Sequence, residues 1–420
     1  MRVEYRKSCG HDGDVRGIWL VVGSYFPTPE SWRCSFVYDQ VRAIERTGRY
    51  RVVVVNTDRE GDYVHGGVHV LGMKCIRRGN AFAPRLYGAI NFMRLKKCLA
   101  KHGIGLMDIS VAQAHLAMCG DLVRRIKCEN PKVKAIVQMH DLDPYGPMLE
   151  GFGHNPFGWR RVLCYLYHRR VIESVDAVVA VSSQVADALR TFPRQRLVVP
   201  YKPMERAMRD LRHCRSGCPR RILILHNGVD RRLFFPSHGH DKVRQDLNTV
   251  VIGCVGNFTA GKNQITLIKA VISILRIQDC RLRVRFVGTG PCLEDCRSFA
   301  EKSGFAEVFS FEGERGHEEM PDFFRQIDLF VLPSFFDACA CVFLEAYACG
   351  VPFIAGAGYG MDDFISDNDR DKWLCRPFDV DDLASKLLNF IRTRPQQRLS
   401  REFDIDRLVP QFVQEVESLA

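Results

Sequence analysis

The sequence has no long apolar run and no leader-like beginning. None of its hydrophobic segments approaches the roughly 20 residues needed to span a bilayer. Residues 1–16 are charged and have no apolar stretch, unlike a secretory signal. Repeats and low-complexity tracts are also lacking, while 46% hydrophobic and 26% charged residues among 420 are typical of a soluble globular protein. We therefore expect a cytoplasmic protein, with peripheral contact to the inner face of the membrane left open.

Cysteines are numerous but lack a pattern that would predict disulfides or a metal site. The 17 cysteines are an odd number scattered through apparent strands and helices, which favours reduced thiols that act as small core residues. The best-spaced pairs, Cys214/Cys218 and Cys292/Cys296, have neither C-x-x-C spacing nor a matching pair of histidines. We expect no metal, and a zinc site is the alternative.

Negative charge is scarce in the first part of the chain. Residues 1–230 carry 37 lysines and arginines against 21 aspartates and glutamates, whereas residues 231–420 carry 23 against 28. A basic half predicts an anionic partner, such as phospholipid head groups, a pyrophosphate-linked substrate or nucleic acid. The alternative is a basic surface that is merely solvated.

Short runs rich in valine and isoleucine alternate with helical patterns in two successive series. Continuously apolar strands of this kind predict parallel sheets covered by helices on both faces. The sequence therefore predicts an α/β fold with two doubly wound, Rossmann-like domains. The predicted strands of the first series are 17–23, 50–56, 133–139, 176–181 and 221–225, and those of the second are 249–256, 281–288, 307–313, 328–333 and 351–355.

The predicted boundary between the domains lies at the Asn-Gly turn of HNGVD, which follows a strand. We expect an N-terminal domain of residues 1–226 and a C-terminal domain of residues 227–404, closed by a helix at 379–391. A last helix at 405–420 is expected to pack back on the first domain. The basic, proline-containing stretch 200–221 predicts an irregular insertion or short helix that either touches a membrane surface or is an ordinary exposed excursion.

A lysine precedes a predicted helix in VIGCVGNFTAGKN (251–263). This segment predicts a strand, a glycine-containing turn and a helix that begins near Gln264. It differs from a Walker A loop at Asn263, where Mg²⁺ binding needs Ser or Thr, and no strand ending in Asp follows, which argues against a P-loop hydrolase. Backbone N–H groups at a helix start and an ammonium still suit a phosphate, so Lys262 is a candidate phosphate ligand or else a surface lysine.

Two further strand ends carry candidate groups. FVGTGP places Gly288 and Gly290 in a tight turn but lacks the third glycine of a dinucleotide fingerprint, so a plain strand-to-helix turn is the alternative. VQMH ends a strand at His140, which is either a hydrogen-bonding or acid/base group between the domains or a structural histidine. The D-x-D spacing at 141–143 resembles that of metal-dependent sugar transferases, but it recurs elsewhere in the chain.

Two carboxylates lie in the otherwise apolar, small-residue stretch PSFFDACACVFLEAYACGVPFIA (333–355). A buried strand precedes it, and ACACVFLEAYACG predicts a helix closed by Gly350. Asp337 falls at the predicted N-cap, where a carboxylate stabilises a helix without any ligand. Glu345 has apolar neighbours that predict burial, where an unpaired charge is costly. Two carboxylates and a helix N-terminus could together hold a polyhydroxylated, phosphate-bearing ligand.

Taken in order, these loops resemble the family 4 glycosyltransferases, which are retaining enzymes with the GT-B architecture of two Rossmann-like domains facing a central cleft. The resemblance covers nearly the whole chain. Its most specific element is PSFFDACACVFLEAYACGVP, which is similar to the family's E-x7-E segment and its trailing A-x-G-x-P. The other matching segments are VVGSYFP, AVVAVSSQV (177–185), LHNGVDRRLF (225–234), GNFTAGKN and FVGTGP.

The resemblance implies a role for each candidate residue. Catalytic roles are implied for His140, which projects from the acceptor-side N-terminal domain towards the sugar, for Asp337 at the transferred sugar, and for Lys262 on the diphosphate. Glu345 matches the glutamate that holds the ribose hydroxyls of a nucleotide-sugar. The other implied donor-binding residues are Gly23 in the first loop, Asn257 in place of the usual arginine, Gly288, Gly290, Ala338, Cys339, Ala340 and Cys341.

The resemblance also implies a function. A retaining glycosyltransferase would move a sugar from a UDP- or GDP-linked donor to a hydroxyl of a glycan or lipid-linked acceptor, without a metal and without nucleic acid, in surface polysaccharide or glycolipid assembly. Three departures leave open a catalytically weak or silent nucleotide-sugar-binding protein: Asp337 is one methylene shorter than Glu, Asn257 is neutral, and YFPTPESWR lacks the usual Gly-Gly. A nucleotide-sugar epimerase, which shares the fold, and a P-loop NTPase are further alternatives.

Overall fold

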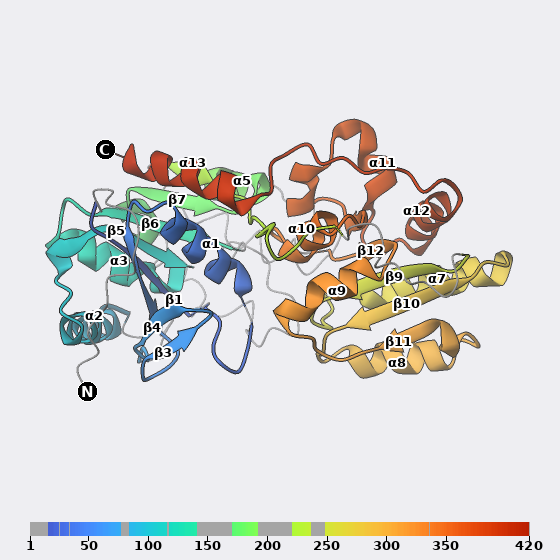
Figure 1. Ribbon diagram of the computed structural model, residues 1–420, viewed down its shortest axis with the longest axis horizontal. Helices are drawn as coiled ribbons and strands as arrows, with labels where there is room; N and C mark the ends of the chain where they lie inside the picture. The colour runs from blue at the N-terminus through green and yellow to red at the C-terminus, as the bar shows by residue number, and fades with distance from the viewer. Residues whose placement is uncertain are drawn as a thin grey trace.

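The structure, a computed structural model, describes residues 16–24, 26–32, 34–76, 84–115, 117–140, 170–191, 221–236, 248–335 and 337–419. Within these ranges the chain forms two α/β units, each built on one sheet (Figure 1). The first sheet has eight strands in the order β3-β4-β2-β1-β5-β6-β7-β8, and the second has six in the order β11-β10-β9-β12-β13-β14. Neighbouring strands are parallel except β3 and β4, which confirms the predicted α/β class with two parallel sheets.

The bounds of the main elements follow. The first unit contains β1 (Ile18–Gly23), α1 (Ser35–Arg46), β2 (Arg51–Asn56), β3 (Tyr63–His65), β4 (Val68–Gly72), α2 (Pro84–Lys101), β5 (Ile109–His115), α3 (Ala117–Glu129), β6 (Lys134–Met139), β7 (Ala177–Ala180), α5 (Ser183–Thr191) and β8 (Ile222–Ile224). The second contains β9 (Val250–Val255), α7 (Gln264–Ile277), β10 (Leu282–Val287), α8 (Leu293–Glu301), β11 (Phe309–Phe311), α9 (Met320–Arg325), β12 (Leu329–Leu332), α10 (Cys341–Ala348), β13 (Phe353–Gly356), η4 (Gly360–Phe364), α11 (Arg370–Trp373), β14 (Leu374–Cys375) and α12 (Val380–Thr393). The last helix is α13 (Ile405–Glu417).

Alternation along each strand divides the side chains of the first sheet between two buried layers. In β1, Leu20 and Val22 belong to one layer, whereas Trp19 and Val21 belong to the other, as the two-residue period of a strand requires. Helix α3 packs against β5 and β6, and α1 packs against β2 and α13. Because both faces are covered, most of these strands are largely apolar and are visible in the sequence as short Val/Ile runs.

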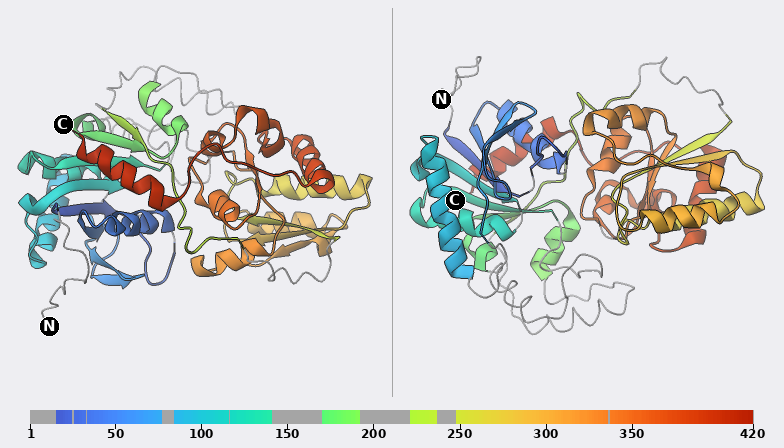
Figure 2. Two further views of the ribbon diagram at one scale, coloured as in Figure 1. Left: turned by 45° about the horizontal axis from the view of Figure 1, so that its top comes forward. Right: turned by 90° about the horizontal axis from the view of Figure 1, so that it is seen from below.

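The C-terminal helix α13 lies on the first unit, although the chain reaches it from the second (Figures 1 and 2). The ring of Phe412 lies 6.0 Å from that of Trp19, and the hydroxyl of Tyr50 donates a hydrogen bond of 3.0 Å to Glu417. The chain therefore crosses between the units twice. The two crossings lie side by side, because Val229 and Asp404 form a parallel bridge.

Each of the ten predicted strand segments overlaps a strand of the structure, and the helices predicted from Gln264 and at 379–391 correspond to α7 and α12. The sequence patterns did not predict β3, β4, β5 and β14. The omission of β5 matters most, since this strand lies at the centre of the first sheet. Gln113 and His115 interrupt its apolar pattern, yet both side chains are buried.

The described residues have neither a membrane-spanning helix nor a cluster of metal ligands. Their helices include none that is long and apolar enough to cross a membrane. Their His, Cys, Asp and Glu side chains include no group of three or more placed to hold a metal ion, and the thiols of Cys292 and Cys296 are free. The pair Cys214/Cys218, the D-x-D at 141–143 and all of the basic stretch 200–221 but its last residue lie outside the described residues.

Candidate active site

Asp337 and Lys262 meet just before the start of α10. The Lys262 ammonium donates a charge-assisted hydrogen bond to the Asp337 carboxylate, and most of both side chains is buried. The N-cap of α10 is Ala340, with no side-chain cap. The predicted N-cap role of Asp337 is therefore wrong: its carboxylate is paired with a full positive charge from the β9–α7 loop instead of a helix N–H.

The β9–α7 loop that carries Lys262 is held by its own hydrogen bonds. The N–H groups of Lys262 and Asn263 both donate to the carbonyl of Thr259, at 3.1 and 3.3 Å. Asn263 has a left-handed backbone, donates from Nδ2 to the carbonyl of Pro333 at 3.2 Å, and accepts a bond of 2.8 Å from the Thr266 hydroxyl. Asn263 is thus a structural residue that ties this loop to the end of β12, and it does not offer the oxygen that a P-loop directs at Mg²⁺.

Gly288 and Gly290 let the β10–α8 loop pass close to the β9–α7 loop. A Cβ on Gly288 would lie 2.3 Å from the carbonyl oxygen of Gly256, and one on Gly290 would lie 2.5 Å from that of Phe258. Both glycines also have positive φ, at 132° and 150°. Their observed contacts are structural, and they shape the backbone beside the exposed Asn257.

Glu345 lies one turn inside α10 and is 8% exposed, so its predicted burial is confirmed. The charge that acts on its carboxylate comes from the other unit, from Asp39 of α1. Burial, reinforced by the charge of Asp39, raises the pKa of Glu345 to about 8. Burial and the charge of Asp230 raise the pKa of Asp39 to about 7. Sequence reasoning missed Asp39, because a lone acid in an amphipathic helix carries no local signal of burial.

The segment between Asp337 and α10 is held from two sides. Asn227, in the first crossing between the units, donates from Nδ2 to the carbonyl of Cys339 at 2.7 Å. The N–H of Gly360 donates to the carbonyl of Asp337 at 3.0 Å. These bonds fix the backbone of Ala338, Cys339, Ala340 and Cys341 where α10 begins, and the first N–H groups of a helix have no acceptor within it. Sequence reasoning read Asn227 only as a turn residue.

His140 and Gly23 lie at the carboxyl ends of β6 and β1 in the first unit. Nε2 of His140 is 2.7 Å from Nδ1 of His115, at the end of β5, and the two rings are nearly parallel. Burial, followed by His115, holds the pKa of His140 well below its usual range. Among the described residues, no hydrogen bond or ion pair joins His140 or Gly23 to the Lys262–Asp337 pair.

A second acid, Asp363 of η4, bonds across the units. Its carboxylate accepts hydrogen bonds from the N–H and the hydroxyl of Ser183, the former at 2.7 Å, and from Nε2 of His226 at 2.8 Å. Burial alone would raise the pKa of Asp363, but the bonds from His226 and Ser183 outweigh it and lower the pKa to about 2. This contact was not predicted, since its three members are far apart in the sequence.

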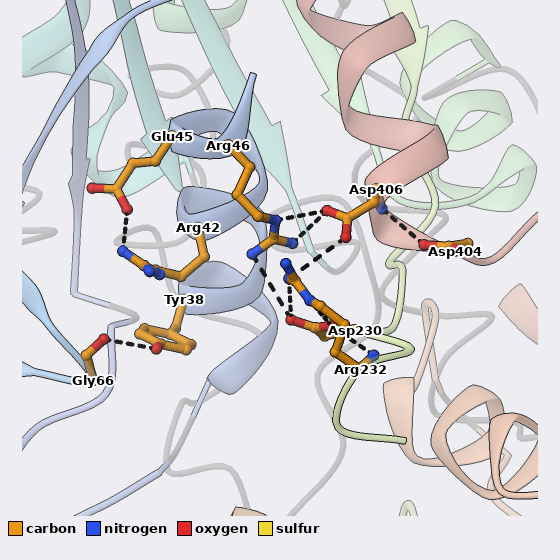
Figure 3. A network of polar contacts seen from close by, with 9 residues as sticks. All are labelled: Tyr38, Arg42, Glu45, Arg46, Gly66, Asp230, Arg232, Asp404 and Asp406. Atoms are coloured by element: carbon orange, nitrogen blue, oxygen red, sulfur yellow. Dashed lines mark hydrogen bonds and ion pairs between the residues drawn. The ribbon is translucent and has the colours of Figure 1, made fainter. Parts of the chain in front are cut away.

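Figure 3 shows a network of ion pairs where the chain crosses between the units. Arg46 of α1 donates to Asp406 of α13 at 2.8 Å, and Arg232 donates to Asp230 at 2.9 Å. Longer pairs of 3.5 and 3.8 Å join Arg232 to Asp406 and Arg46 to Asp230. The network ties both crossings to α1, the helix that carries Asp39.

Two family models match the chain. The model described as Glycosyltransferase Family 4 matches residues 35–205, and the described part of this range lies in the first unit. The model described as Glycosyl transferases group 1 matches residues 249–393, which lie in the second unit. The two matches together include Lys262, Asp337 and Glu345 as well as His140.

Curated relatives with sequence similarity are glycosyltransferases. A D-inositol 3-phosphate glycosyltransferase of Corynebacterium glutamicum is 32% identical over 167 residues, which are 37% of this chain and 40% of the relative. A GDP-mannose-dependent alpha-(1-6)-phosphatidylinositol monomannoside mannosyltransferase of Mycobacterium tuberculosis is 30% identical over 179 residues, which are 33% of this chain and 46% of the relative. The chain thus spans less than half the length of these relatives.

Solved structures share the fold over almost the whole length. Sucrose-phosphate synthase of Thermosynechococcus elongatus has a TM-score of 0.68 at 16% identity, covering 96% of this chain and 99% of that chain. Anabaena HepE, in complex with UDP and glucose, has a TM-score of 0.66 at 15% identity, covering 96% and 100%. These likenesses show the GT-B fold. With matches to both family models and to glycosyltransferase relatives, the chain belongs to the family 4 glycosyltransferases.

Proposed function

We propose that this protein transfers a sugar from a UDP- or GDP-linked donor to an acceptor hydroxyl, with retention of the anomeric configuration. The observation that carries the proposal is the Lys262–Asp337 ion pair beside the N-terminus of α10. An ammonium and helix N–H groups are suited to a diphosphate, and a carboxylate accepts hydrogen bonds from sugar hydroxyls. The two groups that a nucleotide-sugar needs therefore lie next to each other.

Donor binding would exchange one set of partners for another. Without a ligand, Lys262 and Asp337 neutralise each other. A bound donor would place its diphosphate on Lys262 and on the first N–H groups of α10, and its transferred sugar on Asp337. Glu345, further along α10, would accept hydrogen bonds from the ribose hydroxyls. This exchange leaves each buried group with a partner, so the site can open the ion pair without stranding a charge.

The proposed chemistry needs no group beyond the donor, the acceptor and this chain. The acceptor oxygen bonds to the anomeric carbon on the face from which the diphosphate leaves, while the bond between that carbon and the diphosphate oxygen breaks. The acceptor proton passes to the departing phosphate oxygen. Lys262 and the α10 N–H groups stabilise the negative charge that develops there, and closure of the first unit brings His140 to the sugar. No metal is required in this scheme.

The names of relatives support a proposal for the acceptor, and the exposed side chains of α2 support one for the cellular place of the reaction. The relatives named for D-inositol 3-phosphate and for phosphatidylinositol monomannoside support a glycan or glycolipid acceptor. In the first unit, α2 exposes Leu86, Met93, Lys97 and Lys101 along one side. Apolar and basic side chains on one helix face suit an anionic lipid surface. We propose peripheral contact with such a surface, which cosedimentation with anionic and neutral vesicles tests.

Replacing Lys262 tests the donor site. Metal-independent thermal stabilisation by UDP, GDP or their sugar conjugates, with EDTA present, would identify the donor base. Lys262→Ala is expected to weaken that binding by about 10- to 100-fold, because it removes a charge-assisted contact worth about 1.5 to 3 kcal/mol. Lys269→Ala, at an exposed position of α7, the helix that follows Lys262, is the matched control. Unchanged binding and transfer by Lys262→Ala would refute the assignment.

The same assay separates the alternative functions. Binding of a nucleotide-sugar without transfer to any acceptor would indicate a silent binding protein, for which the neutral, exposed Asn257 is the main support. Conversion of one donor into another without acceptor would indicate an epimerase. Stabilisation only by ATP or GTP with Mg²⁺ would indicate an NTPase, against which the buried, hydrogen-bonded Asn263 argues.

A further inference from the structure

A ladder of buried polar side chains runs along β5 and β6. Nε1 of Trp19 donates to Gln113 at 2.8 Å, and Nε2 of Gln113 donates to Gln138 at 2.6 Å. The same Gln138 oxygen accepts a second bond of 3.0 Å from Gln40 of α1. Polar groups are costly in a core unless every one is satisfied, and a satisfied network fixes the rotamers of its members.

His115 and His140 form the last rung of this ladder. In a strand, residues two apart share a face, so His115 follows Gln113 and His140 follows Gln138 on the same face of the sheet. The register of β5 and β6 pairs His115 with Gln138, so His140 lies just beyond the last paired residues of the two strands. The ring centroids of the two histidines are 5.0 Å apart and their planes differ by 7°.

The contacts of His140 leave one of its nitrogens available. Nε2 faces Nδ1 of His115 at 2.7 Å, and Phe36 of α1 packs on the ring with a centroid distance of 4.7 Å. Nδ1 of His140 is buried and has no hydrogen-bond partner among the described residues. An orphaned buried nitrogen at the carboxyl end of a parallel strand is where a ligand group is expected in an open α/β sheet.

We propose that His115 is a positioning residue for sugar transfer: its ring holds Nε2 of His140 and so makes Nδ1 the atom that His140 presents to the donor sugar. The inference rests on the proposed function for the identity of that ligand, but the histidine pair itself is a property of this chain. One nitrogen of the pair must donate and the other accept, because two neutral acceptors 2.7 Å apart would repel.

The shared hydrogen bond also sets the tautomer of His140. If His115 donates, Nδ1 of His140 carries the proton and donates to the sugar; if His140 donates, Nδ1 accepts. Burial lowers the pKa of His115 to about 3, and burial together with His115 lowers that of His140, so both rings are neutral at physiological pH. Either way one tautomer is fixed, which is the property that a positioned hydrogen-bonding group needs.

Imidazole ¹⁵N NMR on histidine-labelled protein measures the tautomer of His140 directly. The signals of His140 are assigned by their loss in His140→Asn. In the wild type, His140 is expected as a single neutral tautomer. His115→Phe keeps a ring in the space but removes the nitrogen, so the His140 signals should move towards a mixture of tautomers. His115→Asn, whose amide can replace Nδ1, should restore the single tautomer. Unchanged His140 signals in His115→Phe would overturn the inference.

Steady-state kinetics test whether the His115–His140 pair matters for sugar transfer. We expect His115→Phe to lower kcat by about 10- to 100-fold, the cost of a small misplacement, while the Kd of UDP or GDP stays within about two-fold, since the second unit holds the nucleotide. His115→Asn should recover most of kcat. Equal damage from both variants would overturn the inference in favour of a packing role.

The two proposals fail differently. A wild type that transfers no sugar would refute the proposed function, while the NMR comparison would still decide whether His115 sets the state of His140. A failure of His115→Phe to fold would be revealed by lost nucleotide binding. In that case the His140 signals of His115→Asn are compared with those of the wild type to decide whether His115 sets the state of His140. A His140 signal that differs from wild type in His115→Asn would then overturn the inference, and an identical one would support it.

Discussion

Replacing Glu345 with glutamine should stabilise the ligand-free protein relative to the wild type at high pH. The difference in stability should grow as the pH rises. Glu345 is 8% exposed, and no side-chain hydrogen bond to its carboxylate is found among the described residues. Asp39, 9% exposed, acts on it from the other unit. Asp39, with a pKa of about 7, loses its proton first, so ionising Glu345 places a second negative charge in the same buried region.

The sign and the magnitude follow from linkage. The pKa of Glu345 is 4.5 in an unfolded chain and about 8 in the native protein. The unfolded state therefore loses its proton first, and the native state loses stability relative to it as the pH rises from 4.5 to about 8. At about 1.4 kcal/mol per pH unit, the loss at pH 7 is on the order of 3 kcal/mol. Glutamine does not ionise and escapes this loss, although its buried amide costs about 1 to 3 kcal/mol if unpaired.

Thermal denaturation at about pH 5.5, 7 and 8.5 tests how the stability difference between variant and wild type changes with pH, rather than the absolute stability of either. The difference in Tm, Glu345→Gln minus wild type, should grow with pH by several degrees, at roughly 2–4 °C per kcal/mol. Glu301→Gln, at an exposed position of α8, is the control and should show no such trend. In an Asp39→Asn background the trend should weaken. A Tm difference that is constant or shrinks with rising pH would refute the reasoning.

Two further substitutions probe the contacts that position the site. Asp363→Asn should cost about 2 kcal/mol at neutral pH, because its native pKa of about 2 is below the ordinary 3.8. That contribution is present above pH 3.8 and is lost as the pH falls towards 2, so equal losses of Tm at about pH 7 and pH 2.5 would contradict it. Gly290→Ala should lower the free energy of unfolding by at least about 2 kcal/mol more than Gly313→Ala. Gly313 shares the positive φ but has nothing within 4 Å of an added Cβ, so equal effects would show that the backbone contact at Gly290 is unimportant.

The sequence predicted the strands with mainly apolar runs and missed β5, in which buried polar groups break the run. β9 and β12 read as Val, Ile and Leu runs because nothing in them is polar. β5 was missed because Gln113 and His115 break the run, and local sequence gives no sign that Gln138, Trp19 and His140 satisfy them. The missed strand β5 therefore contributes Gln113 and His115 to the polar ladder that leads to His140.

The candidate site shows the same division between local and long-range information. The burial of Glu345 followed from its neighbours on one helix and is confirmed. The environment of Asp337 did not follow, because its partner Lys262 lies 75 residues earlier and an N-cap was the best local explanation. Asp39 acts on Glu345 and Asp363 bonds to Ser183, each in the opposite unit. Neither contact has a local signal in the sequence, so only the three-dimensional arrangement reveals them.

The acids at the junction between the units differ in whether the native protein favours their ionised form. Asp363 is fully bonded to Ser183 and His226, and its lowered pKa means that the contact between the units is strongest with the carboxylate ionised. Asp39 and Glu345 resist ionisation in the same arrangement. Ribose hydroxyls that donate to Glu345 would favour its charged form, so we expect donor binding at neutral pH to release a proton. Calorimetry in buffers of different ionisation enthalpy measures that proton, and binding without proton release at pH 7 would exclude Glu345 as a ligand that becomes ionised.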